Sequence, residues 1–349
     1  MIAYDAEHLR DYMAEAARIS PDYPVYLDRF LEGAIESDVD ALCDGEEVYI
    51  GGILEHIEEA GIHSGDSATC IPPFSFSESL QAKLRETTRR IAMALGVRGL
   101  VNVQYAIKGE TVYVIEANPR ASRTVPFISK ATGVPLAKCA ARIMAGDSIA
   151  GLGLPSDERQ LDWFCMKEAV MPWGRFPGAD VILGPEMKST GEVMGIAKSY
   201  PEAYAKTQLA IDYKLPDPSS GKVFISVCDR DKRHILSVAR ILRYLGFDIC
   251  STEGTARVLR GGNVTCEIVE KISGPHDGER PNIGDLIADG KIAVIINTPY
   301  GPGSRGDGYL LRTEAVRRGV TCVTAMSAAN TYVSAIEAVR EDQQGHGSA

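Results

Sequence analysis

Apolar residues recur along the chain at two spacings, and each spacing predicts a different element. Positions three and four apart predict helices over 6–19 and 77–95 and near 124–131 and 135–145. Short runs rich in β-branched and aromatic residues predict strands over 25–30, 38–43, 47–54, 100–107 and 111–117. Asp44-Gly45 and Gly109 lie between consecutive strands, where hairpin turns are expected. The first part of the chain therefore predicts an α+β unit dominated by antiparallel strands.

From Lys222 onward, short apolar strands alternate strictly with helices. The strands are predicted over 222–228, 247–252, 265–271, 291–298 and 320–325. The helices are predicted near 231–244, 283–289, 309–318 and 328–340. Such alternation is typical of an α/β doubly wound, mainly parallel sheet. Because these sheets bind ligands beyond the carboxyl ends of their strands, the expected binding loops are 252–255, 271–280 and 297–305.

Proline, glycine and polar residues mark the expected domain boundaries. Residues 151–159 and 212–222 combine these residue types between periodic segments, as linkers do, and 212–222 is the better boundary. The last nine residues have almost no apolar content and are expected to be disordered. The predicted organisation is an α+β domain over 1–150, an extension and connector over 151–215, an α/β domain over 222–340 and a tail over 341–349.

Composition and charge exclude several classes of protein. With 349 residues and 45% hydrophobic residues, the chain can bury more than one ordinary core. No apolar run approaches the roughly 20 residues that cross a bilayer, and the first residues lack a signal pattern, so we expect a soluble, cytoplasmic protein without a membrane partner. The net charge is −10, and no Lys or Arg occurs between Arg29 and Lys83. Such an acidic surface repels nucleic acid and attracts cations, although a solvated acidic face explains it equally well.

The eight cysteines are spread singly along the chain. No C-x-x-C pair or matched Cys/His spacing is present, so the sequence predicts neither a zinc site nor a disulfide framework. Each cysteine is expected to be a buried thiol that packs as a small hydrophobic residue.

The predicted hairpin at 100–118 carries the candidate chemistry. Glu116 and Asn118 are two residues apart on one strand and share a face, and a short turn would bring Gln104 opposite Glu116. Carboxylate and amide oxygens suit Mg²⁺ or Mn²⁺, which bind phosphate oxygens at the same time. Arg120 and Arg123 follow at a spacing that lets both guanidinium groups face the same site and hold phosphate. Taken alone, the Glu-x-Asn pair is also compatible with an exposed polar strand end.

Three stretches resemble a known family: IEANPRASRTVPFISKATGVPLAK, EHIEEAGIHSGDSA and LGPEMKSTGEVMG. They are similar to the large subunits of carbamoyl phosphate synthetases, and the resemblance covers nearly the entire chain. It implies the C-terminal portion of an ATP-grasp fold, from the half that forms carbamoyl phosphate, followed by a regulatory domain with a methylglyoxal-synthase-like fold. The implied reaction transfers the ATP γ-phosphoryl group to carbamate.

The resemblance also implies roles for individual residues. The implied ligands of Mg²⁺ or Mn²⁺ are Gln104, Glu116 and Asn118, and the implied phosphate contacts are Arg120 and Arg123. The implied adenosine site contains Leu31, Glu36 and His63, and the implied K⁺ site contains Glu36, His56, Glu59 and Ser67. Without the resemblance, His56 and His63 would be read as structural residues.

Regulation is implied for the second domain. The resemblance suggests an effector pocket for UMP or IMP that is made from Lys232, Thr252, Thr255, Lys271, Asn297 and Thr298. Turn and capping roles are the alternative for the three threonines. Pro299 stands where some relatives have a further hydroxyl donor. In some relatives an ornithine site matches Glu58, Asp66, Glu168 and Thr324 here, but Cys322 replaces the tyrosine, so ornithine activation does not follow.

The expected function is therefore part of an ATP-dependent carbon-nitrogen ligase, with a glutaminase small subunit as partner and self-association through the regulatory domain as an option. The family's glycine-rich phosphate loop has no counterpart here, so we expect a C-terminal fragment or truncated reading frame with little or no synthetase activity alone. A non-catalytic nucleotide-sensing module is the alternative. Another ATP-grasp ligase would not account for residues 222–340, and methylglyoxal formation by His276 and Asp277 is disfavoured. The sequence does not decide between pyrimidine and arginine synthesis.

Overall fold

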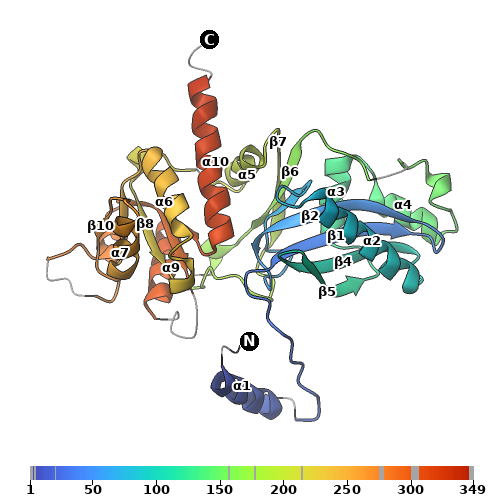
Figure 1. Cartoon of the computed structure of the whole chain (residues 1–349), viewed down its shortest axis with the longest axis horizontal. Coiled ribbons are helices and arrows are strands. Elements are labelled where there is room, and N and C mark those ends of the chain that lie inside the picture. The colour runs from blue at the N-terminus through green and yellow to red at the C-terminus, as the bar shows by residue number, and fades with distance from the viewer. Residues whose placement is uncertain are drawn as a thin grey trace.

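A computed structural model gives the structure of the protein. It describes residues 3, 5–19, 21–155, 158–176, 178–213, 215–274, 279–299 and 306–345. Two sheets organise these residues, one from each part of the chain, and helices pack on both (Figure 1). No helix within the described ranges is long and apolar enough to span a membrane.

The first sheet has seven strands in the order β5-β4-β1-β2-β3-β6-β7, and every neighbouring pair is antiparallel. The strands are β1 (Ile35–Cys43), β2 (Val48–Glu59), β3 (Thr69–Ile71), β4 (Gly99–Lys108), β5 (Thr111–Asn118), β6 (Phe164–Val170) and β7 (Gly191–Ala197). The range 151–215 thus gives β6 and β7 to this sheet. The predicted turn at Asp44-Gly45 is confirmed, because the Asp44 carboxylate accepts hydrogen bonds from the backbone N–H groups of Glu46 and Glu47.

Alternation along β1 and β4 separates an apolar face from a polar face. Val39 and Val103 point toward helix α2 (Glu78–Ala94), which Ser77 caps through its side chain. Tyr105 on β4 and Thr88 on α2 are both buried, and their hydroxyl oxygens lie 2.7 Å apart. Helices α3 (Thr124–Thr132) and α4 (Leu136–Met144) cover part of the opposite face with a second apolar cluster. The remainder of that face carries polar side chains and is free to form a site.

The second sheet has five parallel strands in the order β10-β9-β8-β11-β12, which confirms the predicted doubly wound sheet. The strands are β8 (Lys222–Val227), β9 (Ile249–Ser251), β10 (Glu267–Ile268), β11 (Ile292–Thr298) and β12 (Thr321–Val323). The helices are α6 (Ile235–Tyr244), α7 (Glu253–Gly261), α8 (Ile283–Ala288), α9 (Asp307–Arg318) and α10 (Met326–Gly345). Among the described residues, short 3-10 turns lie at η1 (Ala150–Leu152), η2 (Trp173–Arg175), η3 (Pro218–Ser220) and η4 (Asp229–Asp231).

One apolar cluster joins the two sheets. It includes Met166 of β6, Ala203 of helix α5 (Tyr200–Ala210), Val223 of β8 and Tyr332 of α10. Helix α10 stands between the two units and α5 lies beside it (Figure 1). Each unit also has apolar clusters of its own, so this shared cluster is the part of the core that packs the two units against each other.

Two sequence predictions were wrong at the chain ends. Residues 25–30 form no strand, and Tyr26 is 91% exposed, because no described strand pairs with this segment. The predicted tail begins too early, since α10 continues to Gly345. Residues 346–349 of that tail lie outside the described ranges. Helix α1 (Ala6–Ile19) has its predicted bounds, but it buries no residue and stands apart from both sheets (Figure 1).

Candidate functional site

Strands β1, β4 and β5 carry polar residues in two rows across the sheet. The register aligns Asp38 with Gln104 and Glu116 in one row, and Asp40 with Asn102 and Asn118 in the next. The predicted pairing of Gln104 with Glu116 is therefore confirmed. Because residues at directly opposed positions share a face, the two rows form one polar surface.

A cavity of about 460 Å³ lies over this surface. Six residues named from the sequence line it: Glu36, His63, Gln104, Glu116, Arg120 and Arg123. Asn118 does not line the cavity, but its Nδ2 donates a hydrogen bond to Glu116 Oε1 at 2.7 Å. Leu31 is not among the lining residues either. The structure therefore brings together most of the predicted nucleotide and metal site.

Asp38 and His56 form a buried pair beneath the cavity. His56 Nε2 lies 2.9 Å from Asp38 Oδ2, and each side chain is 1% exposed. Burial opposes protonation of His56, but the hydrogen bond to Asp38 and the nearby charges of Asp38 and Glu36 raise its pKa overall. Burial also raises the pKa of Glu36, whose Oε2 accepts a hydrogen bond from the Gly61 N–H at 3.3 Å.

Asp40 anchors the loop that carries the two arginines. Its carboxylate accepts hydrogen bonds from the Ser122 hydroxyl at 2.6 Å, from the Thr124 hydroxyl, and from Asn102 Nδ2 at 3.3 Å. Burial and the neighbouring charge of Asp38 raise the pKa of Asp40 to about 6. Sequence reasoning missed Asp40 and Asp38. The signal was available, because Asp38 and Asp40 alternate with Val39 and Ala41 along the predicted strand 38–43.

Lys167 of β6 adds a third cationic group to the cavity. Its side chain is 1% exposed overall, and Nζ donates a hydrogen bond to the Ser64 carbonyl at 3.1 Å. Burial lowers the pKa of Lys167. Together with Arg120 and Arg123, this residue places positive charge in the same cavity as the carboxylates. Such a mixture can hold phosphate oxygens and a divalent cation side by side.

The four residues of the predicted K⁺ site have different partners. Glu59 forms an ion pair with Arg230 at 2.9 Å, whereas the Ser67 hydroxyl donates to Glu58 Oε2 at 2.7 Å. Glu36 and His56 remain near the cavity, as described above. Within the described ranges, no three His, Cys, Asp or Glu side chains are arranged to hold a metal ion.

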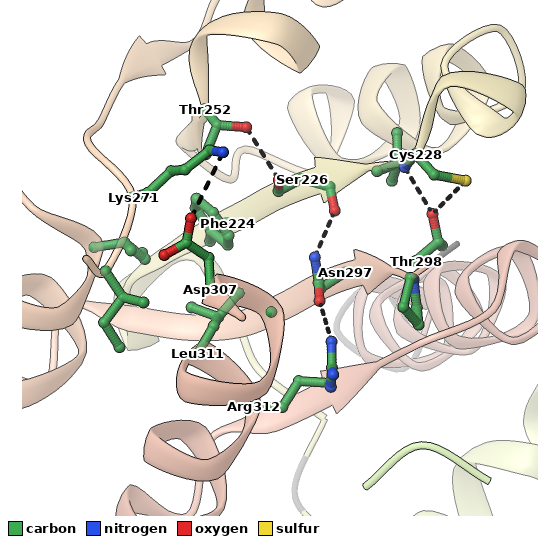
Figure 2. Close-up of a pocket in the computed structure, with 15 residues that line it drawn as sticks. Phe224, Ser226, Cys228, Thr252, Lys271, Asn297, Thr298, Asp307, Leu311 and Arg312 are labelled. Atoms are coloured by element: carbon green, nitrogen blue, oxygen red, sulfur yellow. Dashed lines mark hydrogen bonds and ion pairs between the residues drawn. The ribbon is translucent and has the colours of Figure 1, made fainter. Parts of the chain in front are cut away.

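The second candidate site lies at the carboxyl ends of β8 and β11. A cavity of about 290 Å³ is lined by Thr252, Lys271, Asn297 and Thr298 (Figure 2). An adjoining cavity of about 460 Å³ shares Thr252 and Lys271 and adds Lys232 and Thr255. The structure therefore brings all six predicted effector residues to two connected cavities, at the edge of the sheet where ligands are expected.

Within this region the Thr252 hydroxyl bonds to a neighbouring side chain instead of capping a helix. Thr252 precedes α7, but its side chain makes no capping hydrogen bond, and its hydroxyl oxygen lies 3.0 Å from that of Ser226. Asn297 Nδ2 donates to the Ser226 carbonyl at 2.8 Å, and Lys271 Nζ lies 3.6 Å from Asp307 (Figure 2). By contrast, the Thr255 hydroxyl oxygen accepts a hydrogen bond from the Val227 N–H at 3.2 Å, which ties this residue to β8.

The four residues that match an ornithine site in some relatives lie in different surroundings. Burial raises the pKa of Glu58, and burial together with Glu58 raises that of Glu168 to about 8. Asp66 instead accepts hydrogen bonds from the backbone N–H groups of Lys188 and Ser189, at 2.7 and 2.9 Å. Thr324 lines a cavity of about 540 Å³ at the junction of the two units.

Comparison with known proteins places both parts of the chain in one family. Residues 1–152 match the family model described as carbamoyl-phosphate synthase L chain, ATP binding domain, and residues 234–324 match the MGS-like domain. The chain is 53% identical over 342 residues to the carbamoyl phosphate synthase large chain of Methanothermobacter thermautotrophicus, covering 97% of this chain and 32% of the relative. The chain belongs to the carbamoyl phosphate synthase large-chain family. Its fold is an ATP-grasp portion followed by a methylglyoxal-synthase-like domain.

A second relative is the carbamoyl phosphate synthase large chain, C-terminal section, of Methanocaldococcus jannaschii. It is 49% identical over 349 residues, covering 97% of this chain and 56% of the relative. The chain thus spans about a third of the length of the full large chain that it matches and about half of this section. Among solved structures, the biotin carboxylase domain of a thermophilic 2-oxoglutarate carboxylase is 16% identical, covers 60% of this chain and 53% of that chain, and has a TM-score of 0.47.

Proposed function

We propose that this chain contributes the metal-binding and phosphate-binding part of an ATP-dependent ligase that converts carbamate to carbamoyl phosphate. The observation that carries the proposal is the single cavity that Gln104 and Glu116 line together with Arg120, Arg123 and Lys167. Membership of the large-chain family supports ATP as the phosphoryl donor and a divalent cation as its companion. In the proposed reaction a carbamate oxygen bonds to the γ-phosphorus while the bond to the bridging oxygen breaks and ADP leaves.

The residues present fit a divalent cation that is bound together with a nucleotide. Gln104, Glu116 and Asn118 would hold Mg²⁺ or Mn²⁺, which would neutralise charge on the phosphate oxygens. One carboxylate and two amides form a weak site by themselves, so we infer that phosphate oxygens and water complete the ligand set. Arg120 and Arg123 would hold the phosphoryl group during transfer, and the Asp40 anchor keeps their loop in position.

We further infer partners and regulation from the family. The relatives are named large chains, which supports a smaller partner subunit that we propose to be a glutaminase. We place the assembly in a cytoplasmic enzyme of pyrimidine or arginine synthesis. The second domain is proposed to bind UMP or IMP and to control the enzyme. A K⁺ site at Glu36, His56, Glu59 and Ser67 receives less support, because Glu59 and Ser67 are held by other side chains. The adenosine contact proposed for Leu31 receives no support from the cavity lining.

Substitution of Glu116 tests the metal-binding proposal. We expect Glu116→Gln to weaken binding of Mg²⁺-ADP by about tenfold, because it replaces a charged ligand of the cation by a neutral one. Glu110→Gln makes the same change at the exposed turn of the same hairpin and should leave the affinity unchanged. Isothermal titration of the chain, with and without Mg²⁺, measures both. Equal affinities for the two variants would contradict the metal assignment.

A titration with UMP and IMP separates the ligase proposal from the alternative of a nucleotide-sensing module. If Mg²⁺-ADP binds at the first cavity, the ATP-grasp portion retains its nucleotide function. If only UMP or IMP binds, the sensing module is favoured. We expect Lys271→Met to weaken UMP or IMP binding by about tenfold, because a phosphate loses a cationic partner. Lys291→Met, in which an exposed lysine beside Asp289 is changed, is the matched control.

A further inference from the structure

A chain of hydrogen bonds connects the two cavities, and Arg312 lies at its centre. Arg312 belongs to α9, and its side chain is 0% exposed. Its Nη1 donates to Asn297 Oδ1 at 2.9 Å, and Asn297 lines the second cavity (Figure 2). The guanidinium group also requires the adjacent glycine, because a Cβ at Gly308 would lie 2.7 Å from Nη1. The buried position is therefore shaped around this side chain.

The other edge of the guanidinium group crosses to the first unit of the chain. Arg312 Nε donates to Asp180 Oδ1 at 2.7 Å, and Nη2 donates to Asp180 Oδ2 at 2.8 Å. Two parallel hydrogen bonds fix the position and the orientation of both groups. Asp180 Oδ1 in turn accepts a hydrogen bond from the Ile182 N–H at 3.2 Å. The pair thus determines where the loop of residues 180–189 begins.

The loop of residues 180–189 ends its path at the first cavity. The Gly184 carbonyl accepts a hydrogen bond from the His63 N–H at 2.8 Å, and both His63 and Pro185 line the nucleotide cavity. Asp66 holds the same loop through the N–H groups of Lys188 and Ser189. A shift of Asp180 would therefore be transmitted to His63, because the loop of residues 180–189 is hydrogen-bonded both to His63 and to Asp66.

We propose that the Arg312–Asp180 pair couples occupancy of the second cavity to the position of His63 in the first. A ligand that takes the Asn297 amide as a partner changes the hydrogen bond that Asn297 Oδ1 accepts from Arg312 Nη1. Coupling between two cavities requires that their contacts differ between the free and the bound state. A ligand in either cavity must then change the affinity of the other cavity by the same factor. The proposal rests on the proposed function only in assuming that the second cavity binds an effector.

Amide hydrogen exchange of the whole chain tests the coupling without any ligand. We expect Asn297→Ala to speed exchange at the amides of residues 182–184 and 63 by about tenfold, because the support of Arg312 is lost. Asp180→Asn, which keeps the shape of the side chain, should produce the same pattern. Amides of β4 serve as an internal reference and should not change. Unchanged exchange at His63 in both variants, or equal acceleration in β4, overturns the proposal.

Tyr309→Phe is the matched control. The Tyr309 hydroxyl donates to the Gly178 carbonyl at 2.7 Å, so this variant also removes a hydrogen bond between α9 and the first unit. Tyr309 lines neither effector cavity, and exchange at His63 should stay at the wild-type rate. An acceleration equal to that of Asp180→Asn would overturn the specific role of the pair.

Addition of UMP or IMP distinguishes the coupling from the proposed function. Either nucleotide is expected to change exchange at His63 in the wild type and to have no effect there in Asp180→Asn. A nucleotide that binds both proteins and changes His63 equally in both overturns the coupling. If neither nucleotide binds, the effector assignment fails, and the ligand-free comparison still decides whether the two cavities are connected.

Discussion

Asp40 is a buried carboxylate that supports the first site by holding the loop that carries Arg123. It lies on a central strand, is fully buried, and is held by two hydroxyl groups and one amide. The hydroxyl groups belong to Ser122 and Thr124, which flank Arg123. Burial raises the pKa of Asp40 to about 6, so the folded protein holds a proton there that the unfolded chain releases at lower pH.

This pKa predicts a dependence of stability on pH. Below about pH 4 the group is protonated in both states, and between about 4 and 6 only the folded state keeps the proton, so rising pH favours unfolding. The gap from 3.8 to about 6 corresponds to on the order of 2–3 kcal/mol. We expect the free energy of unfolding of Asp40→Asn, relative to wild type, to rise by that amount between about pH 3 and about pH 7.5 in urea titrations, because these two conditions lie on either side of the transition.

Asp44→Asn provides a control of opposite sign. Partial burial opposes ionisation of Asp44, but hydrogen bonds from the backbone N–H groups of Glu47, Ile149 and Glu46 lower its pKa overall. Its stabilising contribution is therefore present above the unfolded pKa and is lost as the pH falls through the folded pKa. The loss caused by Asp44→Asn should accordingly be larger at pH 7.5 than near about pH 3. The same pH trend for both variants would contradict the assigned environments.

At the scale of elements, β7 and α5 approach each other at a glycine. A Cβ placed on Gly195 would lie 2.1 Å from the Ala203 carbonyl oxygen and 3.0 Å from Thr207 Cγ2. The contact is with helix backbone, which cannot move aside as a flexible side chain could. Helix α5 also supplies Ala203 and Tyr204 to the cluster shared by both sheets, so its distance from β7 affects the junction as well.

Gly195→Ala is therefore expected to lower the free energy of unfolding by about 3 kcal/mol, because strand and helix must separate to admit one methyl group. Gly191→Ala is the control on the same strand, since its Cβ would meet only Val170 at 3.8 Å, an ordinary contact. Urea unfolding of the two variants measures the difference. Equal losses in the free energy of unfolding would show that the cost comes from replacing a glycine in β7 and not from the close approach of β7 to α5.

At the scale of the whole molecule, the two arginines Arg312 and Arg230 form ion pairs between the units in different environments. Arg312 and Asp180 form a pair in which the arginine is 0% exposed. Arg230 pairs with Glu59 and Glu32 while remaining 30% exposed. Solvent and salt screen the second pair far more than the first, so the two pairs should differ in their effect on stability.

We expect Arg312→Met to lower the free energy of unfolding by about 3 kcal/mol, because Asp180 and Asn297 lose their partner in a poorly solvated position. Arg230→Met, the matched change at the exposed pair, should cost about 1 kcal/mol or less. Urea unfolding at low and high salt measures both, and salt should reduce only the effect at Arg230. A larger loss for Arg230→Met would contradict the ranking by burial.

The sequence by itself determined the local elements and one side of the site. Periodicity predicted α2 within a residue at each end, because helix faces and caps are local properties, and the spacing of Glu116 and Asn118 predicted their shared face. Residues 25–30 show the limit, since an apolar run becomes a strand only where a partner strand is available.

The tertiary structure alone decided which distant residues meet. Asp40 reaches Ser122 and Thr124 across 82 and 84 positions, and Asp180 reaches Arg312 across 132. Such contacts depend on the order of strands in a sheet and on the packing of two sheets around one cluster. The spacing of residues along the chain predicts neither the strand order nor the packing of the two sheets, because burial and the choice of partner are properties of the assembled core.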